Sequence, residues 1–176
     1  MYNGGRFPER ELISLIPKDD LKEKLNYGCS ELTSFFLCFE HNYWPIADNV
    51  PTDYTIIDIG CCQGAQSYMF QNHKAYIGVQ PIHHWDGYTP PLKFETANST
   101  YYDMTLQEFL KTELPKGYYI VSAVPGSDDA KDELWERVDN IAIIYPGEEP
   151  RVKGVAREKI LADIEKYALR ERKDYV

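Results

Sequence analysis

Short apolar runs alternate with segments of helical spacing from residue 54 onward. The apolar runs predict five strands, which start near residues 54, 75, 99, 117 and 139. The runs IIDI, YYIVSAV and IAIIY are continuous rather than alternating in their apolar residues, which is typical of parallel strands that are buried on both faces. Strands that alternate with helices form βαβ units, and right-handed crossovers then predict a mainly parallel sheet of strand order 3-2-1-4-5.

Helix signals lie between and after these runs. The stretch GAQSYMFQNH, residues 64–73, predicts a helix after the first strand. Thr105 and Glu108 have the spacing of a capping box at the start of TLQEFLKTEL, and Ser127 precedes the acidic start of SDDAKDELWERV. A last helix is expected over residues 154–174. Helices on both faces of such a sheet define an α/β, doubly wound fold.

The first 50 residues predict a helical extension rather than a part of the sheet. ELISLI ends at Pro17, KDDLKEKLNYG ends at Gly28 in the manner of a C-cap, and SELTSFFLCF places its apolar side chains on one face. The stretch NYWPIADNVPTD, residues 42–53, is broken by Pro45 and Pro51, and we expect it to be an irregular connection.

Composition limits the classes of function. The chain of 176 residues is 43% apolar, which is enough for the core of one domain. The net charge of -9 argues against broad nucleic-acid binding, which needs clustered lysine and arginine. The longest apolar runs are too short to span a bilayer, and the first ten residues lack the apolar core of a signal peptide, so we expect a cytoplasmic protein without a membrane partner. The expected layout is one domain over residues 1–176, with the extension over 1–50, the α/β core over 54–146 and the last helix over 154–174.

The first strand runs into a glycine-containing turn in YTIIDIGCCQGAQSYMF, residues 54–70. In an open parallel sheet, ligands bind outside the carboxyl ends of the strands, and the first strand-to-helix turn is the usual cradle. Gly60 lets a ligand approach the main chain, and Gly64 opens a helix whose free N–H groups favour polar or anionic groups. Asp58, at the end of the strand, can accept a hydrogen bond from a ligand amine or from the N–H groups of the turn.

The segment IIDIGCCQG resembles the first motif of class I S-adenosylmethionine-dependent methyltransferases, an apolar pair followed by D-x-G-x-G-x-G. Asp58, Gly60 and Gly64 match the acid, the first glycine and the last glycine, and Cys62 replaces the middle glycine. That family holds the ribose hydroxyls with an acid at the end of its second strand, where this chain has Gln80. The resemblance covers roughly residues 54 to 146 and implies a Rossmann-like core with S-adenosylmethionine as its cofactor. The tail leaves no room for the usual sixth and seventh strands of the family.

The resemblance also implies which residues line the cofactor site. After the third strand the family has an acid near the adenine amine, and the alignment places Thr105 there, two residues after Asp103. We therefore expect a cleft at the carboxyl ends of the strands, bounded by the turn, Gln80, Thr105 and Ser122. The implied cofactor-binding residues are Asp58, Gly60, Cys61, Cys62, Gly64, Gln80, Thr105 and Ser122. The fourth strand, in YYIVSAVPGSDD, lacks the acidic or NPP-type end of the family, so no catalytic residue carries over.

Two functions from different classes stand side by side. The first is a small S-adenosylmethionine-dependent methyltransferase with an unknown acceptor, which Asp58, Gly60 and Gly64 favour. The second is a non-catalytic binding or interaction module on a degenerate methyltransferase fold, which Cys62 and Gln80 favour.

No metal site is expected. Cys61 and Cys62 have no further cysteine at metal-ligand spacing, and we interpret them as small side chains that a turn tolerates. His83 and His84 are neighbours on an extended segment and point to opposite sides, so both cannot easily serve one metal ion with Asp86.

One segment breaks the alternation of strands and helices. PIHHWDGYTPPLKFETAN, residues 81–98, has three prolines and no helical period, and long irregular stretches after a strand are often functional. Four aromatic residues either cover an adenine or an apolar substrate, or seal loops onto the core: Tyr43, Trp44, Trp85 and Tyr88.

Overall fold

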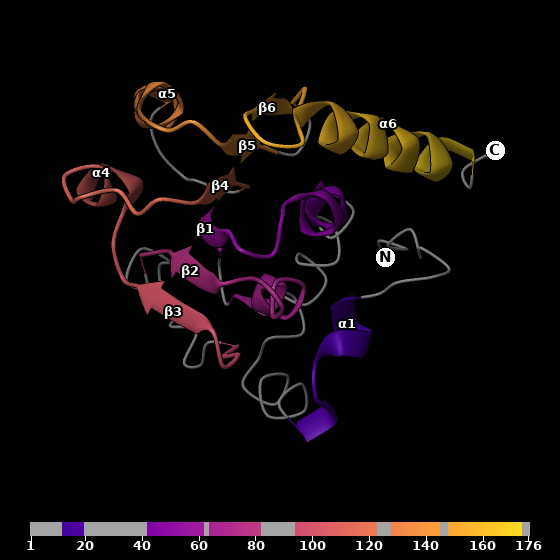
Figure 1. Ribbon diagram of the computed structural model, residues 1–176, viewed down its shortest axis with the longest axis horizontal. Helices are drawn as coiled ribbons and strands as arrows, with labels where there is room; N and C mark the ends of the chain where they lie inside the picture. Colours follow the sequence, from indigo (N-terminus) through magenta and orange to yellow (C-terminus); the bar gives the residue numbers. More distant parts are fainter. Residues whose placement is uncertain are drawn as a thin grey trace, which may run out of the picture.

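A six-stranded sheet organises the computed structural model, which describes residues 12–19, 42–61, 64–81, 94–122, 128–144 and 148–173. The strands lie in the order β3-β2-β1-β4-β5-β6, which can be followed in Figure 1. Their bounds are Thr55–Ile59 (β1), Ala75–Val79 (β2), Ser99–Tyr102 (β3), Tyr118–Val121 (β4), Ile141–Ile143 (β5) and Arg151–Lys153 (β6).

The first five strands are parallel, which confirms the predicted strand order 3-2-1-4-5. β1 is the central strand, since it pairs with β2 on one side and with β4 on the other. All four residues of β4 and all three of β5 are buried, as expected for strands that are covered on both faces.

The sheet has a sixth strand, and this corrects the expectation that the tail leaves no room for one. β6 pairs with β5 in the antiparallel direction, with Val152 buried between two basic residues. Arg151 and Lys153 lie over the ring of Trp135, at 4.5 and 5.0 Å from its centroid, and Arg157 Nε donates to the Val152 carbonyl. A strand of three residues with one apolar side chain carries too little pattern to be recognised in the sequence.

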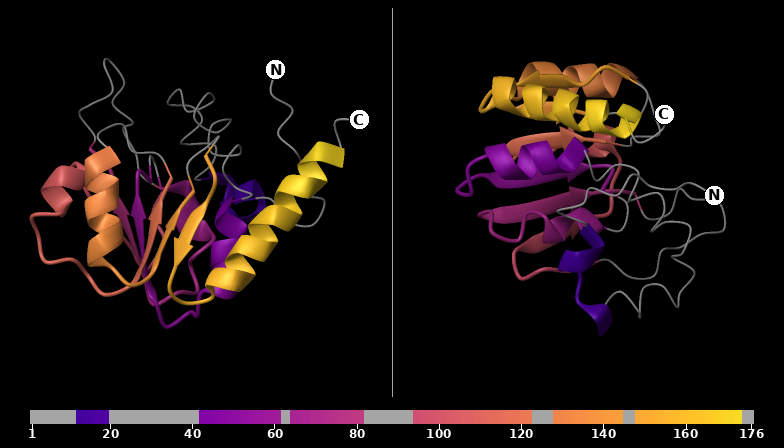
Figure 2. Two further views of the ribbon diagram at one scale, coloured as in Figure 1. Left: turned by 90° about the horizontal axis from the view of Figure 1, so that it is seen from above. Right: turned by 90° about the vertical axis from the view of Figure 1, so that its right-hand side faces the viewer.

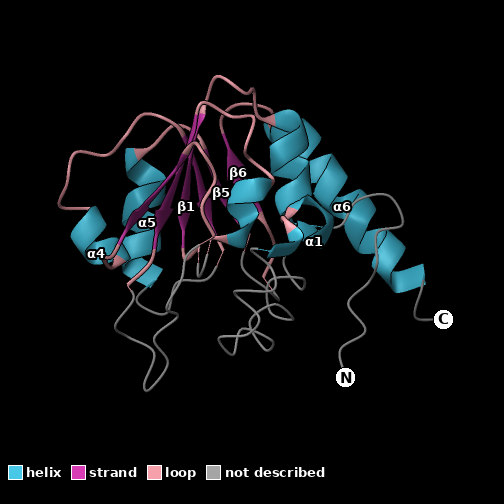
Figure 3. Cartoon of the chain, turned by 90° about the horizontal axis from the view of Figure 1, so that it is seen from below, coloured by secondary structure: helices cyan, strands magenta, loops and turns pink. Residues whose placement is uncertain are grey.

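Helices cover both faces of the sheet (Figures 2 and 3). Figure 3 shows α4 (Leu106–Phe109) and α5 (Asp128–Arg137) on one side, and α1 (Leu12–Leu15) and α6 (Arg157–Lys173) on the other. The 3-10 helix η1 (Ala65–Tyr68) and a helix over residues 42–49 belong to the α6 side, because their buried side chains share one core cluster with Ile56 and Ile160. The other cluster joins Ile57 and Ile59 to α4 and α5.

The helix over residues 42–49 stands where the sequence analysis expects an irregular connection. Pro45 suggested a break, but the backbone is helical on both sides of it, and its helical neighbours Tyr43 and Ile46 are fully buried in the core. Pro51 lies two residues after the last helical residue, Asn49, as is common after a helix end.

The helix predicted over residues 64–73 is shorter than expected. Only Ala65–Tyr68 is helical, and it is a 3-10 turn. Met69, Phe70 and His73 each donate a backbone hydrogen bond to the residue three positions earlier, so the chain reaches β2 through successive tight turns. α4 is short as well, but the capping box between Thr105 and Glu108 is confirmed. Of the helices predicted between residues 9 and 40, only the part over 12–19 falls within the described residues.

Candidate functional site

The switch point of the sheet lies between β1 and β4. From β1 the chain continues to β2 and β3 on one side, and then returns to β4 and β5 on the other side. A crevice forms at such a point outside the carboxyl ends of the strands. Asp58 and Ser122 stand at these ends, and the backbone N–H of Ser122 donates to the Ile59 carbonyl at 3.3 Å. Two of the predicted site residues therefore flank the switch point.

The turn after β1 depends on two glycines with left-handed backbone. Gly60 has φ 84° and Gly64 has φ 77°, a conformation that residues with a side chain rarely adopt. The Gly60 N–H donates to the carbonyl of Val79 at 2.9 Å, and the Gly64 N–H donates to the carbonyl of Cys61 at 2.8 Å. The turn is thus closed on itself and tied to the end of β2. Cys62 lies outside the described residues.

Gly64 also has a packing role that the sequence did not reveal. A Cβ on Gly64 would stand 2.3 Å from Tyr101 Oη, and a Cβ on Gly78 would stand 2.5 Å from Tyr101 Cδ1. The ring of Tyr101 therefore lies across both glycines. The buried thiol of Cys61 also lies next to Gly78, where it packs like a small apolar group.

Asp58 is the centre of a buried hydrogen-bond network. The hydroxyl of Tyr43 donates to Asp58 Oδ1 at 2.9 Å, and the hydroxyl of Tyr76 donates to Asp58 Oδ2 at 2.5 Å. Tyr43 Oη also lies 2.8 Å from Ser122 Oγ. Because a phenol has one proton and Asp58 receives it, Ser122 donates to Tyr43. Asp58, Tyr43 and Tyr76 are fully buried, and Ser122 is 4% exposed.

This environment makes the ionisation of Asp58 less favourable than it is in water. Burial raises the pKa of Asp58 from 3.8 to about 6, and the hydrogen bonds from Tyr76 and Tyr43 oppose that rise. Burial and the neighbouring Asp58 raise the pKa of both tyrosines well above the ordinary value, so they remain neutral donors. Within the described part of the chain, Asp58 is hydrogen-bonded only by neutral hydroxyls and forms no salt bridge.

Two other predicted site residues, Gln80 and Thr105, are not part of the hydrogen-bond network around Asp58 among the contacts described above. Gln80 follows β2, is 5% exposed and donates its backbone N–H to the Tyr102 carbonyl at 3.1 Å. Thr105 caps α4: its hydroxyl accepts from the backbone N–H of Glu108 at 3.2 Å. The structure therefore joins Asp58 to Ser122 through Tyr43, whereas Thr105 serves a helix end after β3.

Tyr43, Tyr76 and Tyr101 are the residues that sequence reasoning missed as part of this site. Tyr43 was considered only as an aromatic cover or as a seal of the core. A signal for Tyr76 was present, because a tyrosine inside a strand that is buried on both faces needs a partner for its hydroxyl. The identity of that partner depends on the fold.

The described part of the chain shows neither a metal-binding cluster nor a membrane-spanning helix. Within this part of the chain, no three His, Cys, Asp or Glu side chains gather in a way that could hold a metal ion. His83, His84 and Asp86 lie outside it, as do Trp85 and Tyr88. No helix among the described residues has the length and apolar character needed to cross a membrane.

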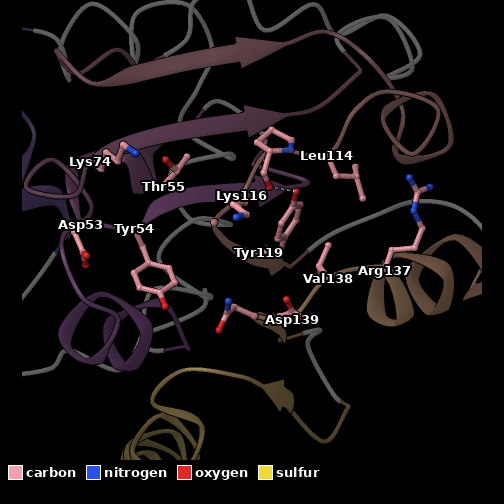
Figure 4. Close-up of a pocket in the computed structure, with 13 residues that line it drawn as sticks. Asp53, Tyr54, Thr55, Lys74, Leu114, Lys116, Tyr119, Arg137, Val138 and Asp139 are labelled. Carbon is pink, nitrogen blue, oxygen red and sulfur yellow. Dashed lines mark hydrogen bonds between the residues drawn. The ribbon is translucent and has the colours of Figure 1, made fainter.

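A cavity of about 490 Å³ lies at the amino ends of the strands, opposite to the switch point (Figure 4). Its lining includes Lys74, Lys116 and Tyr119, and Tyr119 donates to the Pro115 carbonyl at 2.6 Å. The cleft expected at the carboxyl ends involves segments that follow β1, β2, β4 and β5 and that lie partly outside the described residues. That cleft therefore stays a prediction.

Comparison with known proteins finds similarity to a solved structure. No protein-family model and no curated protein matches the chain. A cyclopropane-fatty-acyl-phospholipid synthase-like protein from Lactobacillus casei is similar to it, with 15% sequence identity and a TM-score of 0.46. The similarity covers 58% of this chain and 46% of that protein, so the chain spans less than half of that protein's length.

Proposed function

We propose that the chain is a small methyltransferase-like protein that binds S-adenosylmethionine at the switch point and transfers its methyl group to an acceptor that the sequence does not specify. The observation that carries this proposal is the turn after β1, where Gly60 and Gly64 have left-handed backbone at the carboxyl end of the central strand. The absence of a side chain at Gly60 lets a ligand approach the main chain at the end of the sheet where ligands of open parallel sheets bind.

The residues around the turn fit this cofactor in part. Gln80 would accept from a ribose hydroxyl, and Asp103 and Thr105 follow β3 on the side proposed for the adenine. The side-chain oxygen of Gln66, two residues after Gly64, is buried without a hydrogen-bond partner in the described structure, and a ligand N–H group would satisfy it. When bound, the cofactor would supply an activated methyl group, and the chain would bind and orient it.

A second candidate is a binding or interaction module that has the fold without the catalysis. A specific observation favours it: both oxygens of Asp58 are already hydrogen-bonded by tyrosines, so the core of the protein alone explains this aspartate. The packing of Tyr101 likewise explains Gly64. In this case the matches to the methyltransferase motif reflect packing rather than a cofactor.

Isothermal titration calorimetry with S-adenosylmethionine and S-adenosylhomocysteine tests the proposal. The site variant is Gly60→Ala, which places a side chain in the turn at φ 84°. The matched control is Gly154→Ala, which strains a left-handed glycine at φ 92° in the turn before α6, away from the switch point. Both variants should lose stability, but only Gly60→Ala should lose binding. Absence of binding by the unmodified protein would count against the first function and support the module.

A further inference from the structure

The hydroxyl group of Tyr43 bridges the carboxyl ends of β1 and β4 at the switch point. The hydroxyl contacts Asp58 Oδ1 at 2.9 Å and Ser122 Oγ at 2.8 Å, and these two residues stand on opposite sides of the switch point. All three side chains are buried. A ligand group that reaches Asp58 Oδ1 or Ser122 Oγ must therefore take the place of the Tyr43 hydroxyl.

Tyr43 belongs to an element outside the strand pairing. It lies on the helix over residues 42–49, which precedes β1 and forms no part of the sheet. Tyr76, the other donor to Asp58, lies within β2 and is fixed by the pairing of β2 with β1. Of the two donors, Tyr43 is thus the one that a ligand can displace without opening the sheet.

The ring of Tyr43 and its helix are held by contacts other than the hydroxyl. The ring meets Phe70 edge to face, with 6.3 Å between the centroids. At the other end of the helix, Asn49 Nδ2 donates to the carbonyl of Pro45 and to Asp163 Oδ2 of α6, each at 2.8 Å. Removal of the hydroxyl alone should therefore leave the ring and the helix in place.

From this arrangement we infer that Tyr43 is an autoinhibitory contact: its hydroxyl competes with the cofactor for Asp58 and Ser122, and cofactor binding displaces it. The inference rests on the proposed function, since it concerns the same site. The chain sets the affinity of its own site in this way, because each bound cofactor must replace two hydrogen bonds that the free protein already makes.

The variant Tyr43→Phe tests this inference, with Tyr119→Phe as the matched control. Tyr119 is also buried and also donates one hydrogen bond, but its partner is Pro115 at the amino ends of the strands. Calorimetry with S-adenosylmethionine should show binding that is roughly ten-fold tighter for Tyr43→Phe, the equivalent of one charge-assisted hydrogen bond. The Tyr119→Phe variant should bind like the unmodified protein.

The possible outcomes separate the inference from the proposed function. If the unmodified protein binds and Tyr43→Phe binds equally or more weakly, the inference is wrong and the proposed function stands. If neither protein binds, both are wrong. Should Tyr43→Phe fail to fold, Asn49→Ala replaces it, because this variant loosens the helix at Asp163 while the Tyr43 hydroxyl stays. It should also tighten binding, and unchanged binding would overturn the inference.

Discussion

Replacement of Asp58 by asparagine should change how the stability of the protein depends on pH. Asp58 is fully buried, and its pKa rises from 3.8 to about 6 in the folded protein. One pKa unit corresponds to about 1.4 kcal/mol, so the ionised carboxylate costs the folded state about 3 kcal/mol relative to the unfolded chain. This cost is fully present above pH 6. It is relieved as the pH falls toward 3.8, because the folded protein then binds a proton that the unfolded chain does not.

Asparagine at this position removes the charge and keeps the shape. Its amide group can donate to Tyr43 Oη, and Tyr43 can then donate to Ser122 Oγ, which lies 2.8 Å away. The direction of this chain of hydrogen bonds reverses, Tyr76 still donates to the amide oxygen, and each of the three hydroxyl groups keeps a partner. The variant should therefore fold, and it should lack the part of the pH dependence that Asp58 contributes.

Urea denaturation followed by far-ultraviolet circular dichroism measures the effect. Between about pH 8 and pH 5, the free energy of unfolding of the unmodified protein should rise relative to that of Asp58→Asn by about 1.4 kcal/mol. The control Asp53→Asn removes one carboxylate from an exposed position. If the difference in the free energy of unfolding between Asp58→Asn and the unmodified protein is the same at both pH values, ionisation of the buried carboxylate does not destabilise the folded protein as proposed.

Three further predictions concern the same region. Tyr43→Phe should lower the free energy of unfolding by about 1.5–3 kcal/mol near pH 8 and by less near pH 5, as measured by urea denaturation at the two pH values. The reason is that Asp58 Oδ1 loses a hydrogen-bond donor, which stabilises the ionised carboxylate more than the neutral one. Gly64→Ala should destabilise the protein by at least ~1 kcal/mol, because residue 64 has left-handed backbone and a Cβ there would collide with Tyr101. An unchanged midpoint of thermal unfolding would contradict the packing of Tyr101 on Gly64. Gln80→Glu should raise the affinity for S-adenosylmethionine roughly ten-fold, as measured by calorimetry, because a carboxylate accepts more strongly than an amide from ribose hydroxyls. The same variant should be less stable without ligand, because residue 80 is 5% exposed.

The sequence was sufficient for the order of the strands, because runs such as IIDI and IAIIY are longer than chance patterns and are separated by clear helix starts. It was misleading at Pro45, since a proline disfavours a helix but does not prevent one whose neighbouring apolar side chains pack in the core. β6 was missed because one apolar side chain between two basic ones holds too little pattern.

The network around Asp58 could not be predicted from local patterns. Tyr43 is separated from Asp58 by 15 positions and from Ser122 by 79, so only the packing of the helix on the sheet brings the three together. The motif indicated that Asp58 matters, but the identity of its partners is a tertiary property.

β6 has a consequence for the behaviour of the protein at high concentration. The last strand of an open sheet presents backbone groups to which the edge of another molecule can pair, and this is a route to aggregation. β6 is short, carries Arg151 and Lys153 held over Trp135, and has its Val152 carbonyl bonded by Arg157. A second copy of the chain would meet two basic side chains and an occupied acceptor at this edge. The strand that the sequence concealed therefore hinders the addition of neighbouring molecules at its own end of the sheet, the end opposite to β3.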